Sequence, residues 1–280
     1  MDKRAGSDPY CEIAREIGGE NMKFVQTTFE ALRPMIQKNV EENRVTVDSF
    51  WEQHIIESNH YAIQDGAETV GYFCIHNAKT ITGFYLKESH VQHGKALFEQ
   101  IKRYEQVTNA MVATGDEIFL SHCVDTYARV EKQAFFSIYR DEVPSGFQRI
   151  PLEFRRVACV ADLELLKLAG DFFAEEPLDK IFDEGFHYRI YTVYDQEVLV
   201  GFGVVETGRV LPGIASIGMY VMEDKRRMGY AKNILRQLCE MMTAEGYSCR
   251  SGCWYYNHNS LKSMESAGAY SKTRLLRFYF

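Results

Sequence analysis

The sequence predicts a mixed α/β protein built from two copies of one domain. Its 280 residues correspond to about two domains of ordinary size. Apolar runs typical of strands occur in both halves together with helical patterns, which indicates mixed α and β structure. A strand–loop–helix segment of the first half also recurs in the second half at a constant spacing, and this predicts a duplicated domain.

In the second half, six runs rich in β-branched and aromatic residues predict strands. They span residues 153–160, 187–195, 197–206, 215–222, 248–256 and 275–280. Helical periodicity predicts helices over residues 162–173, 229–244 and 260–266.

The first half has a similar order of elements. Helices are predicted over residues 28–39, 47–56, 94–104 and 125–132, and strands over 60–65, 68–77, 80–87, 117–123 and 134–140.

The repeat is clearest around two glycines. Residues 84–102 align with residues 219–237 without a gap, so that Gly94 and Ala96 match Gly229 and Ala231, 135 residues later in each case. Upstream, Val70 matches Val200 at an offset of 130, which places five extra residues in the second copy near 207–213. Residues 141–151 concentrate Pro, Gly and Ser and predict the linker. We therefore expect domains at 1–145 and 150–280.

The composition excludes collagen-like, disordered and low-complexity proteins. The chain is 46% hydrophobic and 25% charged, which is ordinary for a globular protein, and it carries a net charge of −7. An acidic chain without a long apolar run or a secretory signal predicts a cytoplasmic protein with no nucleic-acid or membrane partner. Seven scattered cysteines predict reduced thiols rather than disulfides or a metal site.

The strongest local signal is the segment MYVMEDKRRMGYAKNILRQ, residues 219–237. A predicted strand ends near Val221, and a predicted helix starts near Gly229. The free N–H groups of a first helical turn and the positive end of the helix dipole attract anions. Gly229 permits close approach of an anion to the backbone, and the basic run 225–227 adds positive charge. The segment therefore predicts a phosphate site in an otherwise acidic protein.

This segment resembles the acyl-coenzyme A signature of the GNAT N-acetyltransferase superfamily, Gln/Arg-x-x-Gly-x-Gly/Ala. Arg226, Gly229 and Ala231 occupy its three fixed positions. Val221 stands five residues before Arg226, as the strand valine of the family does, although Glu223 replaces a frequent proline. Downstream, Asn257, Ser260 and Gly268 have the separations usual in the family. The resemblance covers about residues 150–280.

The resemblance implies two tandem GNAT-like domains, each with a mixed, mostly antiparallel sheet flanked by helices. It also implies acetyl-CoA as the cosubstrate, with no metal, and direct attack by a primary amine of a small molecule or peptide in a ternary complex. The diphosphate would bind backbone amides 227–232, and the pantetheine arm would add to the strand like a further strand. The expected cofactor-binding residues are Met219, Tyr220, Val221, Arg226, Arg227, Met228, Gly229, Tyr230, Ala231, Lys232, Asn257 and Ser260.

The catalytic groups are less clearly marked. Many GNAT enzymes carry a tyrosine that protonates the leaving thiolate, and Met264 stands at that position. Tyr256 is the preferred substitute, and Tyr220, Tyr255 and Tyr270 are further candidates. Glu206, near the end of a predicted strand, and Glu223 are candidate bases, and a water chain is an alternative.

The first copy keeps Gly94 and Ala96, but Val91 replaces the signature arginine and the basic run becomes HVQ. We expect a degenerate domain that does not bind coenzyme A. The leading hypothesis is therefore an acyl-CoA-dependent N-acetyltransferase whose second half is active. The alternatives are a non-catalytic CoA-binding sensor or scaffold, and an aminoacyl transferase of the same tandem fold, which the intact motif and the acidic charge disfavour.

Overall fold

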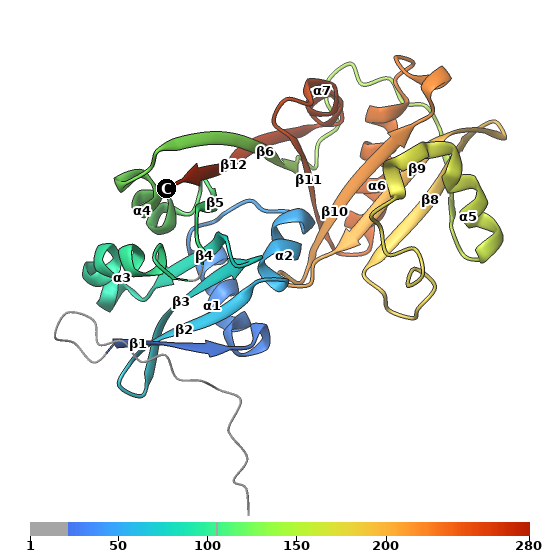
Figure 1. Ribbon diagram of the computed structural model, residues 1–280. Helices are drawn as coiled ribbons and strands as arrows, with labels where there is room; N and C mark the ends of the chain where they lie inside the picture. The colour runs from blue at the N-terminus through green and yellow to red at the C-terminus, as the bar shows by residue number, and fades with distance from the viewer. Residues whose placement is uncertain (1–21, 105) are drawn as a thin grey trace, which may run out of the picture. The chain divides into compact units, whose positions relative to one another are not determined.

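The computed structural model describes residues 22–104 and 106–280, which form two compact units (Figure 1). Within the described residues, unit 1 comprises residues 22–45, 53–131 and 276–280, and unit 2 comprises residues 46–52 and 132–275. Each unit therefore contains a segment from the other half of the sequence. Cys11 lies outside the described residues.

Unit 1 is built on the strands β1 (Met22–Thr27), β2 (Asn59–Asp65), β3 (Glu68–His76), β4 (Thr80–Leu86) and β5 (Asn109–Ala113), in that order, with the end of β12 (Ala269–Tyr279) next to β5. All pairs from β1 to β4 are antiparallel, and β4 and β5 are parallel. The helices are α1 (Phe29–Glu42), the second half of α2 (Ser49–Ile56), α3 (Gly94–Ile101) and α4 (Glu117–Asp125), with a 3-10 helix η1 (Glu88–His93) before α3.

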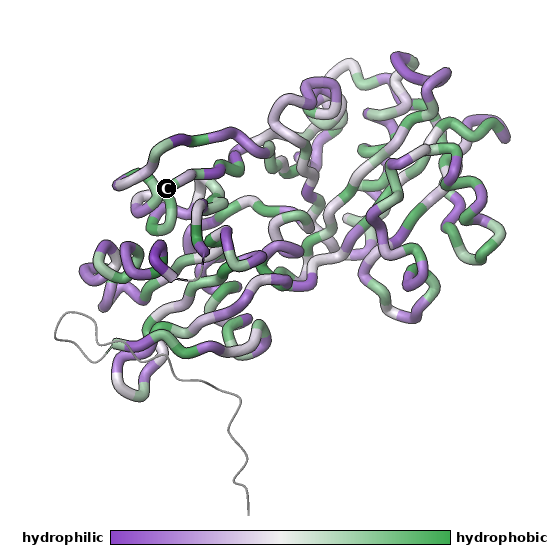
Figure 2. The backbone as a smooth tube through the Cα atoms, viewed as in Figure 1, coloured by the Kyte–Doolittle hydropathy of each residue, from purple (hydrophilic) through white to green (hydrophobic). Residues whose placement is uncertain are grey.

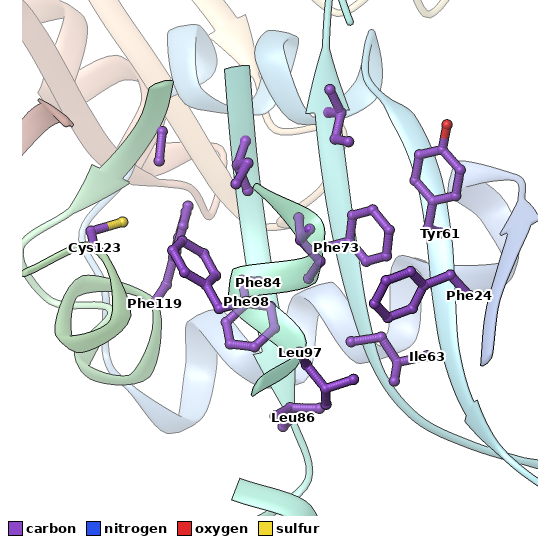
Figure 3. Close-up of a cluster of buried hydrophobic side chains, with 14 of the residues drawn as sticks. Phe24, Tyr61, Ile63, Phe73, Phe84, Leu86, Leu97, Phe98, Phe119 and Cys123 are labelled. Atoms are coloured by element: carbon purple, nitrogen blue, oxygen red, sulfur yellow. The ribbon is translucent and has the colours of Figure 1, made fainter. Parts of the chain in front are cut away.

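The core of unit 1 is rich in aromatic residues (Figure 3). Phe73 of β3 packs against Phe24 and stacks on Tyr61, with ring centroids 4.8 and 4.7 Å apart. Phe98 of α3 meets Phe84 of β4 edge to face at 5.2 Å. Burial of such large side chains is the main source of stability for a sheet covered by helices.

Unit 2 has the strand order β12, β6 (Arg129–Tyr139), β11 (Ser248–Trp254), β10 (Ile214–Val221), β9 (Val198–Thr207), β8 (Tyr188–Asp195) and β7 (Glu153–Arg156). The β10–β11 pair is parallel, and β6–β11, β9–β10, β8–β9 and β7–β8 are antiparallel. Its helices are α5 (Val160–Leu166), α6 (Tyr230–Ala244) and α7 (His258–Ser266), with 3-10 helices η2 (Lys167–Phe173) and η3 (Glu223–Lys225).

Separate clusters cover the two faces of the sheet in unit 2. On one face, Val221 and Ile217 of β10 pack with Leu238 of α6. On the other, Phe202 of β9 and partly buried Tyr220 pack with Phe173 of η2. Figure 2 shows the hydrophobic strands of this sheet and the hydrophilic loop between β10 and α6. We call the face with Tyr220 and Phe202 the α5 face, and the opposite one the α6 face.

The predicted fold class is confirmed: the sheets are mixed and mostly antiparallel, and helices flank them. Two local predictions were wrong, and two strands were not predicted. Residues 117–123 form helix α4 rather than a strand, because Asp116 caps it by accepting from the Phe119 N–H at 3.3 Å, and Phe119 and Cys123 bury one helical face. Residues 129–139 are strand β6, so the helix predicted over 125–132 is absent. Strands β1 and β5 were missed.

The segment predicted as a linker is held firmly by α6. Asn233 accepts a hydrogen bond from the Ile150 N–H at 2.9 Å, and Gln237 donates to the Ile150 carbonyl at 2.9 Å. The buried Arg236 guanidinium donates to the carbonyls of Arg140 and Asp141 at 2.9 and 2.7 Å. These polar groups of α6 fix the helix against residues 140–152 and so fix the position of its N-terminus.

Candidate functional site

Strands β10 and β11 separate within unit 2. Their parallel pairing covers only three residue pairs, of which the last is Ser216 with Arg250. One further link follows, in which Ser251 Oγ donates to the Ile217 carbonyl at 2.6 Å. Both strands then continue, to Val221 and Trp254, without pairing to each other. The edge of β10 beyond Ile217 therefore has backbone groups available for a ligand, and we call this separation the split.

The direction of each backbone group on β10 follows from strand alternation. The Met222 N–H donates to the Val200 carbonyl of β9 at 3.0 Å. Because successive residues of a strand direct their backbone groups to opposite sides, Tyr220 also faces β9, whereas Met219 and Val221 face the split. Of the three β10 residues predicted to contact the cofactor, Met219 and Val221 have their backbone groups in position to do so. Tyr220 would contribute its side chain.

The loop after β10 has an unusual conformation. Arg227 and Gly229 both have positive φ, at 66° and 88°. For arginine this left-handed conformation is unfavourable, and for glycine it has no steric cost. Gly229 is also the N-cap of α6 and supplies no capping side chain. Left-handed residues in a turn are also found in the backbone conformations that form anion-binding nests.

Six consecutive backbone N–H groups in this loop are free. Those of residues 227–232 donate to no acceptor within the part of the chain that the structure describes, and the first N–H of the helix to find one is that of Asn233, which donates to the Gly229 carbonyl at 3.4 Å. Free amides at the start of a 15-residue helix, combined with the helix dipole, favour the binding of an anion. The predicted residues Arg227, Met228, Gly229, Tyr230, Ala231 and Lys232 are therefore brought together.

The basic side chains of the loop are mostly engaged locally. Lys225 pairs with Asp224 at 2.8 Å, and Arg226 pairs with Glu223 at 3.4 Å. Arg226 also donates from Nε to the Val221 carbonyl at 3.4 Å and lies over the Tyr220 ring at 5.8 Å. Arg227 is exposed and has no ion pair within the described residues. Arg226 therefore fastens the loop to the end of β10, and Arg227 is the cation available to a ligand.

The Asn-x-x-Ser motif starts helix α7. Asn257 Oδ1 accepts the Ser260 N–H at 3.1 Å, which is an N-cap interaction. Three residues before Asn257, β11 ends in exposed Trp254, and the ring of Tyr256, which is 54% exposed, lies 5.0 Å from the Trp254 ring. Met264 is buried in the α6-face core and reaches no solvent-exposed position.

Glu206 lies on the α5 face, at the end of β9 and opposite Ser216. It is within 3.3 Å of Arg209 and 3.5 Å of His187, and it accepts a hydrogen bond from Ser49. Burial raises the pKa of the Glu206 carboxyl, and the hydrogen bond from Ser49 and the Arg209 charge oppose this shift. Glu223, the other candidate base, is exposed and paired with Arg226.

Asp48 is a buried carboxyl of unit 2, 7% exposed, that the sequence did not predict as a site residue. Asp48 caps the start of α2 by accepting the Trp51 N–H at 3.3 Å. A β-carbon at position 252 of β11 would collide with Asp48 Oδ2, so only glycine leaves room for this carboxyl. Burial raises the pKa of Asp48 to about 7, opposed by hydrogen bonds from backbone N–H groups, and Glu206 and Glu52 add to the rise. No motif marks Asp48, which precedes β11 by about 200 residues.

Unit 1 has the same split but a different loop. Strands β4 and β5 pair only at Thr80–Asn109 and Ile81–Ala110. The loop after β4 forms the 3-10 helix η1, and Gly94 has a helical φ of −53° with its N–H donating to the Val91 carbonyl. A β-carbon on Gly94 would collide with the His122 ring of α4. The amides of this loop are thus used internally.

The described residues contain no group of three or more His, Cys, Asp or Glu side chains arranged to hold a metal ion. Over the same residues, no helix combines the length and apolar character needed to cross a bilayer.

Comparison with known proteins agrees with this geometry. A model described as an acetyltransferase (GNAT) domain matches residues 28–140, and one described as the acetyltransferase (GNAT) family matches residues 157–269. A search of curated proteins found no match. The chain therefore belongs to the GNAT acetyltransferases and carries two GNAT domains in tandem.

Solved structures share the fold at low sequence identity. A GNAT-family acetyltransferase from Colwellia psychrerythraea is 17% identical with a TM-score of 0.77, covering 92% of this chain and 99% of that chain. A tandem GNAT protein from the clavulanic acid biosynthesis pathway is 9% identical with a TM-score of 0.59, and the match covers 92% of this chain and 97% of that chain. A GCN5-related N-acetyltransferase from Sphaerobacter thermophilus is 12% identical with a TM-score of 0.58, and the match covers 92% of this chain and 94% of that chain. The fold supports acyl transfer in general.

Proposed function

We propose that this protein is an acyl-CoA-dependent N-acetyltransferase that transfers an acetyl group from acetyl-CoA to a primary amine. The observation that carries the proposal is the run of six free N–H groups from Arg227 to Lys232, beside a strand edge left open by the split. An anionic diphosphate with an extended arm fits this pair of features better than a lone phosphate. We further propose that residues 150–280 form the catalytic domain and that residues 1–145 form a degenerate one.

In this proposal the diphosphate of acetyl-CoA binds the amides of residues 227–232, and Arg227 adds a positive charge. The pantetheine arm lies along the edge of β10, where Met219 and Val221 direct their backbone groups into the split. The Val221 N–H donates to the thioester carbonyl and stabilises the negative charge that develops there. Asn257 and Ser260, at the start of α7, border the same site.

The acceptor is an amine of a small molecule or peptide. Its nitrogen attacks the acyl carbon directly, so that no covalent enzyme intermediate forms, and the thiolate leaves. We assign protonation of the thiolate to Tyr256, an exposed tyrosine two residues beyond the end of β11, with Tyr220 as the alternative donor. Buried Met264 takes no part in this step.

Calorimetric titration of the full chain with acetyl-CoA tests the proposal. We expect one site per chain and release of free thiol when amines, amino acids, polyamines or aminoglycosides are added. Absence of binding would overturn the proposal. Binding without thiol release above the blank for any acceptor would instead indicate a CoA-binding sensor.

A further inference from the structure

We propose that Asp48, carried by the first half of the sequence, is the general base of the acyl-transfer site in unit 2. This inference rests on the function proposed above and names the group that takes the proton from the attacking amine. It differs from the sequence-based expectation, in which Glu206 or Glu223 has this role.

The position of Asp48 relative to the split is the first argument. Continuing the parallel register of β10 and β11 beyond Ser216 and Arg250 places Gly218 opposite Gly252. Asp48 Oδ2 occupies the space that a side chain at position 252 would take, whereas a β-carbon on Gly218 would meet only Val204, at 3.8 Å. The missing side chain of Gly218 therefore leaves room on the β10 side of the split, and on the β11 side an oxygen of Asp48 takes the place of a side chain at Gly252.

The second argument is that Asp48 is held rigidly. The Ser49 N–H donates to Ser216 Oγ of β10 at 2.8 Å. One turn later, Glu52 accepts the backbone N–H groups of Arg209 and Leu211 at 2.7 and 2.8 Å. These bonds fasten the first turn of α2 to the α5 face of the sheet. A base positioned by several hydrogen bonds costs little to orient in the transition state.

The surroundings of Asp48 explain how its carboxylate can accept a proton near neutral pH. Burial is the largest cause of its raised pKa, and the carboxyls of Glu206 on β9 and Glu52 on α2 add to it. Burial raises the pKa of the Cys253 thiol on β11 to about 11, and the charge of Asp48 adds to that rise. The backbone N–H groups of Trp51 and Phe50 oppose the shift. A base whose pKa lies near the working pH is the most effective one.

Glu206 is less suited to the same role. It lies on β9, one strand further from the split, and it is engaged with Arg209 and Ser49. Its negative charge acts on Asp48, so we assign it a positioning role through electrostatics. Glu223 is an exposed residue of the phosphate loop and its pair with Arg226 fixes that loop.

The proposed step balances as follows. The amine nitrogen forms a bond to the acyl carbon, and the C–S bond breaks with its electron pair remaining on sulfur. The Asp48 carboxylate takes the proton that the nitrogen loses. The leaving thiolate takes a proton from a tyrosine or from water, and Asp48 returns its proton to solvent after the product leaves.

The test is Asp48→Asn in the full chain, because asparagine retains the N-cap of α2. We expect acetyl-CoA affinity within about twofold of the original chain by calorimetry, and a fall in kcat/KM of about 10² to 10⁴. The acid limb of the pH–rate profile, near pH 7 in the original chain, should disappear. Glu206→Gln should retain that limb but move it to lower pH, because a like charge beside Asp48 is removed.

The matched control is Asp116→Asn. Asp116 is a buried N-cap aspartate of unit 1 whose pKa burial raises to about 6, so the same chemical change is made in the other unit. It should leave kcat/KM unchanged. A readout independent of turnover is the ¹³C shift of the Asp48 carboxyl, which should titrate near pH 7 in the original chain and lower in Glu206→Gln.

Three results would overturn the inference. Thiol release by Asp48→Asn at the rate of the original chain would show that Asp48 is not the general base and would leave the proposed function intact. Loss of the acid limb in Glu206→Gln but not in Asp48→Asn would assign the role of general base to Glu206. If the original chain binds no acetyl-CoA, the proposed function fails, and this inference fails with it.

Discussion

The loops that follow β4 in unit 1 and β10 in unit 2 start alike and end differently. Each begins with an N–H that returns to the neighbouring strand, from Lys87 to Val70 at 2.8 Å and from Met222 to Val200 at 3.0 Å. In unit 1 the chain then winds into η1, and Gly94 has a helical φ. In unit 2 the chain is extended at Arg226, and Gly229 has a φ of 88°.

This difference shows that a glycine in the aligned position does not by itself make a phosphate site. Gly94 admits the His122 ring, whereas Gly229 turns the backbone so that six amides remain free. The same residue type thus permits helix packing in one unit and a left-handed turn of the backbone in the other. The predictions below alter one side of this comparison at a time.

The largest effect should come from Gly229→Val. A β-branched residue is strained at positive φ, so the loop must change its path and the free amides lose their common direction. We expect acetyl-CoA affinity to fall by more than about 100-fold, measured by calorimetry. Gly94→Val is the matched control: it should displace His122 and lower the free energy of unfolding by about 1–3 kcal/mol, yet leave the affinity unchanged. The reverse result would assign the active site to unit 1.

A charge exchange between the two loops should have the next largest effect. Replacing Arg226 and Arg227 by Gln should weaken acetyl-CoA binding by about 10-fold or more and reduce its dependence on salt. Placing the basic run in unit 1, as His90→Lys, Val91→Arg and Gln92→Arg, should create no second binding site, because the amides of η1 stay engaged. A stoichiometry of two in this triple variant would show that charge alone decides between the units.

Two buried capping aspartates allow a third comparison. Burial raises the pKa of Asp116 in unit 1 to about 6 and that of Asp48 in unit 2 to about 7. Unfolded carboxyls titrate near pH 4, so each group is protonated more readily in the folded chain. Its ionisation lowers the free energy of unfolding as pH rises from about 4 through the folded pKa, by about 3 kcal/mol for Asp116 and about 4 kcal/mol for Asp48.

Urea unfolding between pH 4 and pH 8 measures this effect. Asp116→Asn should flatten the pH dependence between about pH 4 and 6, and Asp48→Asn between about pH 4 and 7, since asparagine caps the helix without a charge. Unchanged slopes in both variants would show that these carboxyls are not desolvated as the structure indicates.

The loop with the free amides could be predicted from the sequence because its signal is local. The end of β10, the basic run and Gly229 lie within ten residues, and the helix that follows is strongly periodic. Asp48 could not be found in this way, since its role depends on contact with Gly252 and its burial depends on tertiary packing. The strand predicted over 117–123 was wrong for a related reason, because the capping role of Asp116 outweighed a short apolar run.

The Asn257 motif offers the smallest and most discriminating effect. In the structure its Oδ1 caps α7, a role that the family signature by itself does not reveal. Asn257→Ala should lower the free energy of unfolding by about 1 kcal/mol, as Thr28→Ala, the N-cap of α1 in unit 1, also should. Asn257→Asp keeps the cap and removes the amide donor. If Asn257 binds acetyl-CoA through that donor, Asn257→Asp weakens binding by several-fold at unchanged stability; an unchanged affinity would make the residue a helix cap only.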